Sequence, residues 1–146
     1  MVVGRKWVMK RWVDGMPSKD DFEIVSEELG SCGDGEVIFE ALFCSVDPYQ
    51  RAYSRSMQPP FTMFGYQGGL KHYGKKLSFT ELEDIEEQIF NFQVAKVLES
   101  KDKNYPLGSL MVSHQGWCDK GKVNPSKLPP QHCRPATDLK VTLKNR

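Results

Sequence analysis

The chain has 146 residues, with 20 basic and 19 acidic side chains and a formal net charge of +1. This balance gives no electrostatic reason to expect nucleic acid or an anionic membrane as a partner. No apolar run approaches the ~20 residues of a membrane span, and the start lacks the apolar core of a signal peptide. We therefore expect one soluble, cytoplasmic domain, which at this length can bury a core of its own.

Three strands are predicted in the first third of the chain. Residues 6–13 mix apolar and basic side chains in partial alternation, and residues 22–28 alternate apolar and polar side chains. Such alternation is typical of a strand with one face in water. The strongest prediction covers residues 36–46, whose near-continuous apolarity indicates that both faces of the strand are covered.

The third strand ends in a polar corner, Asp47-Pro48-Tyr49-Gln50-Arg51. Pro48 has no backbone N–H to give to a sheet, and it biases Asp47 toward an extended conformation. The corner therefore presents polar side chains at the mouth of a β core, and loops on a rigid scaffold commonly carry function. We expect Arg51 to hold this loop, for example by pairing with Asp47, rather than to contact substrate.

A helix is predicted over residues 79–91. Ser78 and Glu81 have the spacing of a capping box, and the acidic residues that follow suit the positive end of a helix dipole. Apolar side chains recur at helical spacing, at Phe79, Leu82, Ile85, Ile89 and Phe92. We expect this stripe to pack onto the domain rather than to bind a partner.

Two further strands are predicted over residues 93–99 and 110–114. Residues 124–135 hold four prolines and little periodicity, so we expect an extended surface segment there, and residues 140–146 carry no clear signal. The sum is a mainly β domain of short strands with one helix.

The chain contains four cysteines with no C-x-x-C pair: Cys32, Cys44, Cys118 and Cys133. Without a secretory signal, reduced thiols are a better interpretation than a disulfide framework. A zinc site could be assembled on paper from two of these thiols and two histidines, Cys118, Cys133, His114 and His132. Their spacings match no common zinc pattern, so we expect no metal.

Several segments, taken in order, resemble a known family. Residues 36–43 followed by Val46-Asp-Pro-Tyr-Gln-Arg51 resemble the N-terminal half of the zinc-independent medium-chain reductases. Residues 6–7 and 21–23 fall where that family has its first hairpin.

Later segments extend the resemblance. Residues 62–65 resemble the family's loop before its next strand, and residues 93–101 are similar to its central strand. Residues 106–112 and Gly116-Trp117 follow in the family's order. The resemblance covers roughly residues 3–67 and 93–139, and the ordered motifs make it specific.

The resemblance implies a GroES-like, partly open β barrel followed by a Rossmann domain that binds NADPH. Enzymes of this family reduce the carbon–carbon double bond of α,β-unsaturated ketones and aldehydes, so the implied substrate is a small enone. Hydride goes to the β carbon, and a donor near the carbonyl oxygen stabilises the developing enolate.

The resemblance also assigns the site residues. It implies that Pro48 and Tyr49 contact the cofactor, that Tyr49 and Tyr66 line the substrate cleft, and that Tyr66 is catalytic. The alternative for both tyrosines is plain packing, with Tyr49 at the strand end and Tyr66 over the barrel.

Zinc-dependent relatives place a cysteine at the end of the strand that corresponds to residues 36–46, and a histidine in a Gly-His-Glu motif. Here the region of residues 45–47 takes the first place, and Gly65-Tyr66-Gln67 takes the second. A tyrosine, whose pKa is about 10, does not replace an imidazole ligand at neutral pH. We therefore expect no catalytic zinc.

The chain departs from the family at residues 68–93. In the family, the strand that corresponds to residues 93–101 follows almost directly after the loop that corresponds to Gly65-Tyr66-Gln67, whereas here these 26 residues separate the two. Gln67 and Gln93 bracket this insert, so one hypothesis is that the insert is translated from retained non-coding sequence. The capping box and the apolar stripe argue against this hypothesis. We expect a GroES-like domain over residues 1–139, interrupted by the insert, and a tail over residues 140–146.

The second departure concerns the cofactor. No Gly-x-Gly-x-x-Gly motif and no second βαβ pattern follows, so we expect the Rossmann domain to be absent. We also expect the chain alone neither to bind NADPH tightly nor to turn over. Two alternatives stay open: a stand-alone β-barrel interaction module, and a regulatory fragment that forms a homodimer or pairs with a full-length paralogue.

Overall fold

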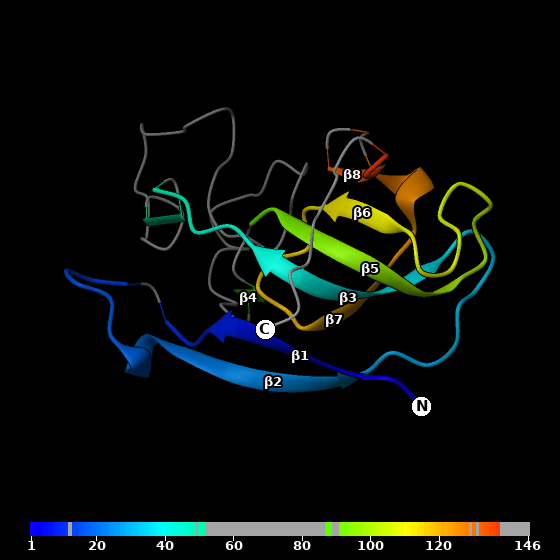
Figure 1. Cartoon of the computed structure of the whole chain (residues 1–146). Coiled ribbons are helices and arrows are strands. Elements are labelled where there is room, and N and C mark those ends of the chain that lie inside the picture. The colour runs from blue at the N-terminus through cyan, green and yellow to red at the C-terminus, as the bar shows by residue number, and fades with distance from the viewer. Residues whose placement is uncertain are drawn as a thin grey trace, which may run out of the picture.

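The computed structural model describes residues 1–11, 13–48, 50–51, 91–128, 130 and 132–137, together with the backbone of residues 87–88. In this part of the chain the fold is mainly β, and every strand pair is antiparallel. Figure 1 shows the β1–β2 hairpin lying along one side of a larger sheet.

The strands form two sheets. The smaller sheet has the order β2-β1-β4, with bounds Phe22–Glu28, Val3–Met9 and Glu87–Gln88. The larger sheet has the order β7-β3-β5-β6-β8, with bounds Lys120–Val123, Val37–Cys44, Gln93–Ser100, Leu110–Ser113 and Cys133–Pro135. Two short 3-10 helices, η1 (Lys19–Asp21) and η5 (Pro125–Lys127), precede β2 and β8.

Strand β3 carries the core. Val37, Ile38 and Phe39 are fully buried, because successive side chains point to opposite faces and both faces are covered here. Val37 and Phe39 join the main core cluster, whereas Ile38 packs on the other face in a smaller cluster. Toward Cys44 the strand becomes exposed, so the predicted coverage of both faces holds for its first half only.

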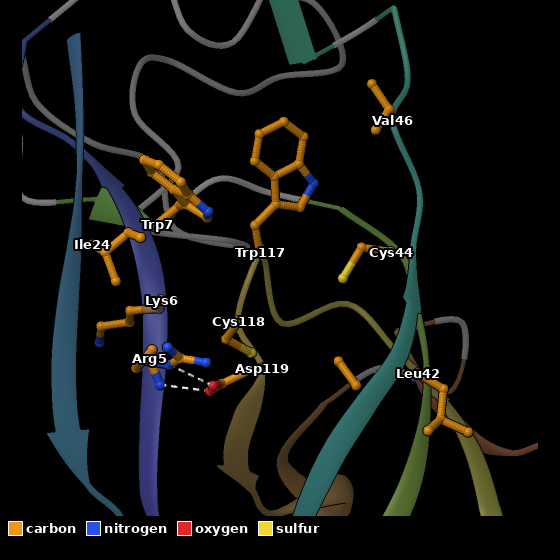
Figure 2. Close-up of a pocket in the computed structure, with 11 residues that line it drawn as sticks. Arg5, Lys6, Trp7, Ile24, Leu42, Cys44, Val46, Trp117, Cys118 and Asp119 are labelled. Atoms are coloured by element: carbon orange, nitrogen blue, oxygen red, sulfur yellow. Dashed lines mark hydrogen bonds and ion pairs between the residues drawn. The ribbon is translucent and has the colours of Figure 1, made fainter. Parts of the chain in front are cut away.

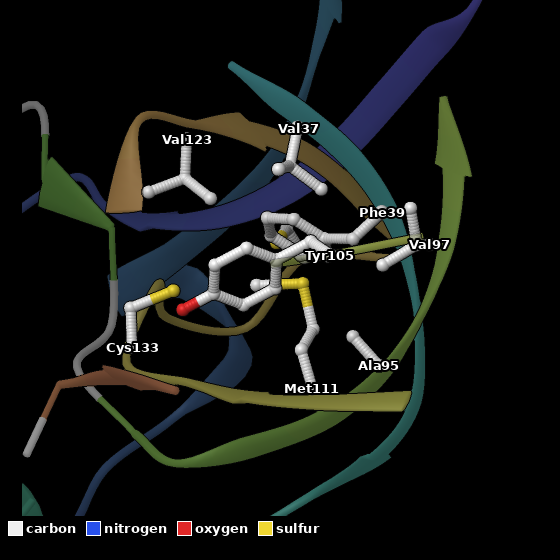
Figure 3. Packing of buried hydrophobic residues seen from close by; sticks show 9 residues of the cluster. Val37, Phe39, Ala95, Val97, Tyr105, Met111, Val123 and Cys133 are labelled. Carbon is white, nitrogen blue, oxygen red and sulfur yellow. The ribbon is translucent and has the colours of Figure 1, made fainter. Parts of the chain in front are cut away.

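The main core cluster fills the space inside the larger sheet (Figure 3). Its members are Val37, Phe39, Ala95, Val97, Tyr105, Met111, Cys118, Val123 and Cys133. Burying one large aliphatic or aromatic side chain stabilises a fold by about 1.5–3 kcal/mol, so this cluster is the principal source of stability. The burial also raises the pKa of the Tyr105 hydroxyl.

The two sheets are joined where β1 passes the segment before β7. The Trp7 backbone N–H donates to the Trp117 carbonyl at 2.8 Å, and the Asp119 N–H donates to the Arg5 carbonyl at 2.9 Å. The Arg5 guanidinium also pairs with the Asp119 carboxylate at 2.8 Å. These bonds partly close the two sheets on each other, and the predicted partly open, GroES-like β barrel is confirmed.

Most of the strand predictions are confirmed. The segment 22–28 coincides with β2, and the predictions at 36–46, 93–99 and 110–114 agree with β3, β5 and β6 to within two residues. The first strand spans Val3–Met9 rather than residues 6–13.

The prediction of a surface segment over residues 124–135 is wrong at its end. β8 pairs with β6 there, because the edge of β6 offers backbone N–H and C=O groups that a short strand can bond. The Cys133 side chain is buried. β7, which pairs with β3, was not predicted.

The predicted helix over residues 79–91 is wrong where the structure describes it. Glu87–Gln88 form β4, which pairs with Val8 and Met9 of β1. A capping box stabilises a helix only modestly, and the open edge of β1 offers backbone partners with which these two residues pair instead. The remainder of that prediction, most of the insert 68–93 and the tail 140–146 lie outside the described residues.

Candidate functional site

The end of β3 is fixed by hydrogen bonds from two directions. The Ser45 N–H donates to the Phe92 carbonyl at 2.8 Å, and the Phe92 N–H donates to Ser45 Oγ at 3.1 Å. The Ser45 carbonyl accepts from Trp117 Nε1 at 3.1 Å and from Asn91 Nδ2 at 3.4 Å. Segments far apart in sequence thereby hold the residue from which the corner departs.

The corner itself is a tight helical turn. The Asp47 N–H donates to Gln50 Oε1 at 2.9 Å, and the Gln50 and Arg51 N–H groups donate to the carbonyls of Asp47 and Pro48, each at 3.1 Å. Pro48 suits the first position of such a turn, where a missing N–H costs nothing. An Arg51 Nη2 group donates to the Gly15 carbonyl, so this side chain ties the corner to the β1–β2 connection.

Of the predicted site residues, the structure describes Pro48, which is exposed on the corner. Tyr49 and Tyr66 lie outside the described residues, and their roles stay predictions. Asp47 is half-buried, with its Oδ2 atom fully buried.

A cluster of polar side chains that the sequence did not indicate as a unit lies beneath the corner. The His114 ring stacks on Phe92 with centroids 4.1 Å apart, and the His132 ring lies 5.4 Å from it. Burial, followed by the neighbouring His132, lowers the pKa of His114 to about 4, and Asp47 opposes this shift. His114 is therefore neutral at pH 7. The signal that could have found it is a histidine at the end of a predicted strand.

Two oxygens of this cluster are buried without a hydrogen-bond partner in the described part of the chain. They are Asp47 Oδ2 and Asn91 Oδ1, and the Asn91 side chain has no exposed surface. A buried unsatisfied polar atom costs about 1–3 kcal/mol, so these two oxygens mark the cluster as a candidate position for a further polar partner.

Two grooves flank the strand end. The tryptophan groove, of about 560 Å³, lies between Trp7 and Ile24 of the hairpin and Val46 and Trp117 of the opposite side (Figure 2). The second groove, of about 550 Å³, is lined by Phe43, Ser45, Phe92, Val94, Val112 and Arg134. Cys44 lines both grooves.

The corner fits one end of a nicotinamide cofactor. Val46 is 80% exposed in the tryptophan groove and Phe43 is 53% exposed in the second groove, so each groove offers an apolar side chain to a planar ring. The corner carries the carboxylate of Asp47 and the guanidinium of Arg51, whose Nη2 group donates to the Gly15 carbonyl. Among the described residues, no group of three or more His, Cys, Asp or Glu side chains is placed to hold a metal ion.

The sequence and the fold of this chain are similar to those of the N-terminal part of known oxidoreductases. Residues 5–68 match the family described as the N-terminal domain of oxidoreductase. The chain is 35% identical to prostaglandin reductase 1 of Oryctolagus cuniculus over 117 residues, 80% of this chain and 26% of the relative. It is also 26% identical to the NADP⁺-dependent 2-alkenal reductase of Nicotiana tabacum over 129 residues, 86% of this chain and 32% of the relative.

A solved structure supports the same fold. The crystal structure of CurA from Vibrio vulnificus in complex with NADPH superposes with a TM-score of 0.63 at 18% identity, covering 82% of this chain and 30% of that chain. The resemblance to the medium-chain reductases is thereby confirmed: this chain is related to their N-terminal part. It spans about a quarter to a third of the length of these relatives. No helix of the described residues has the length and apolarity to cross a membrane.

Proposed function

We propose that this domain supplies the N-terminal half of an NADPH-dependent active site that reduces the carbon–carbon double bond of α,β-unsaturated ketones and aldehydes. The observation that carries the proposal is the fixed end of β3, which holds the Asp47–Arg51 turn beside two grooves. The relatives that match this region are reductases of prostaglandins and 2-alkenals.

In this proposal each residue of the corner has a distinct task. NADPH, when bound, supplies a hydride to the β carbon of the enone. Pro48 and Tyr49 pack against the nicotinamide end, and the Tyr66 hydroxyl donates to the carbonyl oxygen as negative charge develops there. No metal takes part in this proposal, since the region of residues 45–47 and Tyr66 stand where zinc-dependent relatives have a cysteine and a histidine.

The 146 residues by themselves are proposed to be inactive. The sequence contains no glycine-rich loop for a diphosphate. A second domain must therefore bind the phosphates and cover Phe43, Val46 and Phe92, which are 41–80% exposed. The same exposed side chains favour the alternative of a regulatory module that pairs with another chain.

The test joins this chain to the remaining part of rabbit prostaglandin reductase 1. The chimera should oxidise NADPH only when an enone is present, and Tyr66→Phe should lower kcat about 100-fold, as expected for loss of one oxyanion donor. Tyr105→Phe is the matched control, because Tyr105 is buried in the main core cluster and itself lines neither groove. Equal kcat values for the two variants would remove Tyr66 from its role.

The chain alone is tested by fluorescence titration with NADPH. We expect no saturation below the millimolar range, and a micromolar Kd would contradict the need for a second domain. Size-exclusion chromatography with and without a full-length paralogue tests the regulatory alternative, which predicts co-elution.

A further inference from the structure

Cys44 faces the mouth of the barrel because of a β-bulge in β3. Ala41 pairs with Ala95 and Phe43 pairs with Val94, so Leu42 is an extra residue on β3. Side chains alternate along a strand, and one extra residue moves all that follow to the opposite face. Cys44 pairs directly with Gln93 and therefore shares the inward face of Gln93.

Cys118 reaches the same place from the opposite wall. Its side chain is buried and belongs to the main core cluster. Gln93 Nε2 lies 3.6 Å from Cys44 Sγ and 3.4 Å from Cys118 Sγ, so the two sulfurs are no further apart than the sum of these distances. Figure 2 shows the two side chains pointing toward each other across the tryptophan groove.

We propose that Cys44 and Cys118 are a redox-active thiol pair that forms a reversible disulfide with a low-molecular-weight disulfide, such as glutathione disulfide, as oxidant. The Cys44 thiolate attacks one sulfur of glutathione disulfide, which forms a mixed disulfide and releases one glutathione thiolate. The Cys118 thiolate then attacks Cys44 Sγ, which forms the protein disulfide and releases the second glutathione. The two protein thiols lose two electrons and two protons, and these convert one glutathione disulfide into two glutathiones.

The surroundings assign different tasks to the two thiols. Cys44 is exposed and lines both grooves, so an incoming disulfide can reach it first. Arg134 lines the second groove beside Cys44 and offers a cation to the carboxylates of glutathione. Because Cys118 is buried, an incoming disulfide does not reach it first, and it acts second as the resolving thiol. This assignment is independent of the reductase proposal.

Oxidation would change the corner. A disulfide bond is about 2 Å long, so the two sulfurs must approach each other past the Gln93 amide. Cys44 directly precedes Ser45, whose backbone fixes the start of the corner. The cross-link would therefore narrow the tryptophan groove and shift the strand end that leads to Pro48.

The test incubates the native 146-residue chain in glutathione buffers of increasing oxidised fraction, followed by alkylation and peptide mapping. We expect two of the four thiols to disappear together and a Cys44–Cys118 peptide pair to accumulate, with full reversal by excess glutathione. Cys118→Ser should stop at a stable glutathione adduct on Cys44, and Cys44→Ser should react at least about 10-fold more slowly.

Cys32 and Cys133 provide the matched controls. Both are buried, and burial raises the pKa of each thiol, so Cys32→Ser and Cys133→Ser should leave the cross-link unchanged. The wild-type map decides the matter even where a serine variant folds poorly. A persistent glutathione adduct on wild-type Cys44, or a cross-link that involves Cys32 or Cys133, would overturn the proposal.

Discussion

Replacement of Gln93 by leucine tests the polar network that holds the site together. Gln93 is 2% exposed and is the first residue of β5. Its Nε2 donates to the Gly116 carbonyl at 2.6 Å and to the Cys118 carbonyl at 3.2 Å. Its Oε1 accepts from Ser113 Oγ at 3.2 Å, and Ser113 has no exposed surface.

Leucine fills nearly the same volume but removes all three of these hydrogen bonds; the Gly116 carbonyl still accepts from the Cys118 N–H at 3.1 Å. Each buried polar group that loses its partner costs about 1–3 kcal/mol. Because the added apolar burial offsets part of this cost, we expect Gln93→Leu to lower the free energy of unfolding by about 3–5 kcal/mol. Against a typical stability of about 5–15 kcal/mol, this is a large fraction of the total.

Urea unfolding followed by tryptophan fluorescence measures the effect. Gln115→Leu is the control, because this half-buried residue lies beside the same loop and should change the free energy by less than about 0.5 kcal/mol. The predicted role of Gln93 is contradicted when the free energy of unfolding of Gln93→Leu lies within about 1 kcal/mol of that of the parent chain, with the same dependence on urea concentration.

Two further predictions concern the sheet junction and pH. A Cβ on Gly4 would lie 2.4 Å from the Lys120 carbonyl oxygen, a backbone atom that cannot rotate away, so Gly4→Ala should lower the free energy of unfolding by about 1–3 kcal/mol. The control is Gly33→Ala, whose Cβ would meet only the flexible Glu36 side chain at 3.1 Å and which should cost far less. Equal urea midpoints for the two variants would contradict the clash at Gly4. The pKa of His114 lies at about 4 in the folded chain against 6.5 in the unfolded chain, so the unfolded chain binds the proton first and stability falls as the pH drops from about 6.5 to about 4. Discounted for solvent screening, the loss in the free energy of unfolding is up to about 2 kcal/mol. In a plot of the urea midpoint against pH, His114→Phe should reduce the fall between pH 6.5 and pH 4.

The long strands could be predicted because their own residues carry the signal. β2 alternates apolar and polar side chains over its first three residues, and β3 and β5 are apolar where they cross the core. β7 and β8 could not be predicted in this way. β7 contains two lysines and a glycine, and β8 ends in a proline. Their backbones are ordered by the partners β3 and β6 rather than by their own pattern.

The site was predicted in part for a similar reason. The apolar run and Pro48 locate the corner from local residues alone. Asn91 and Trp117 both donate to the Ser45 carbonyl only after folding, and nothing in their spacing indicates that they share this partner. The error over the predicted helix has the same origin, because a local capping pattern at Ser78 says nothing of the open edge of β1 that β4 occupies.

The bulge at Leu42 explains why alternation fails at the point where function begins. Counted from Phe39 at a strict period of two, Cys44 would face outward and Ser45 inward. The extra residue reverses both, so Cys44 meets the Gln93 amide, while the Ser45 backbone turns to the Phe92 segment. A strand end is a favourable place for such a defect, because few ladder hydrogen bonds remain to be lost beyond it. The register shift, rather than the identity of any one residue, therefore sets which groups the corner presents to the two grooves.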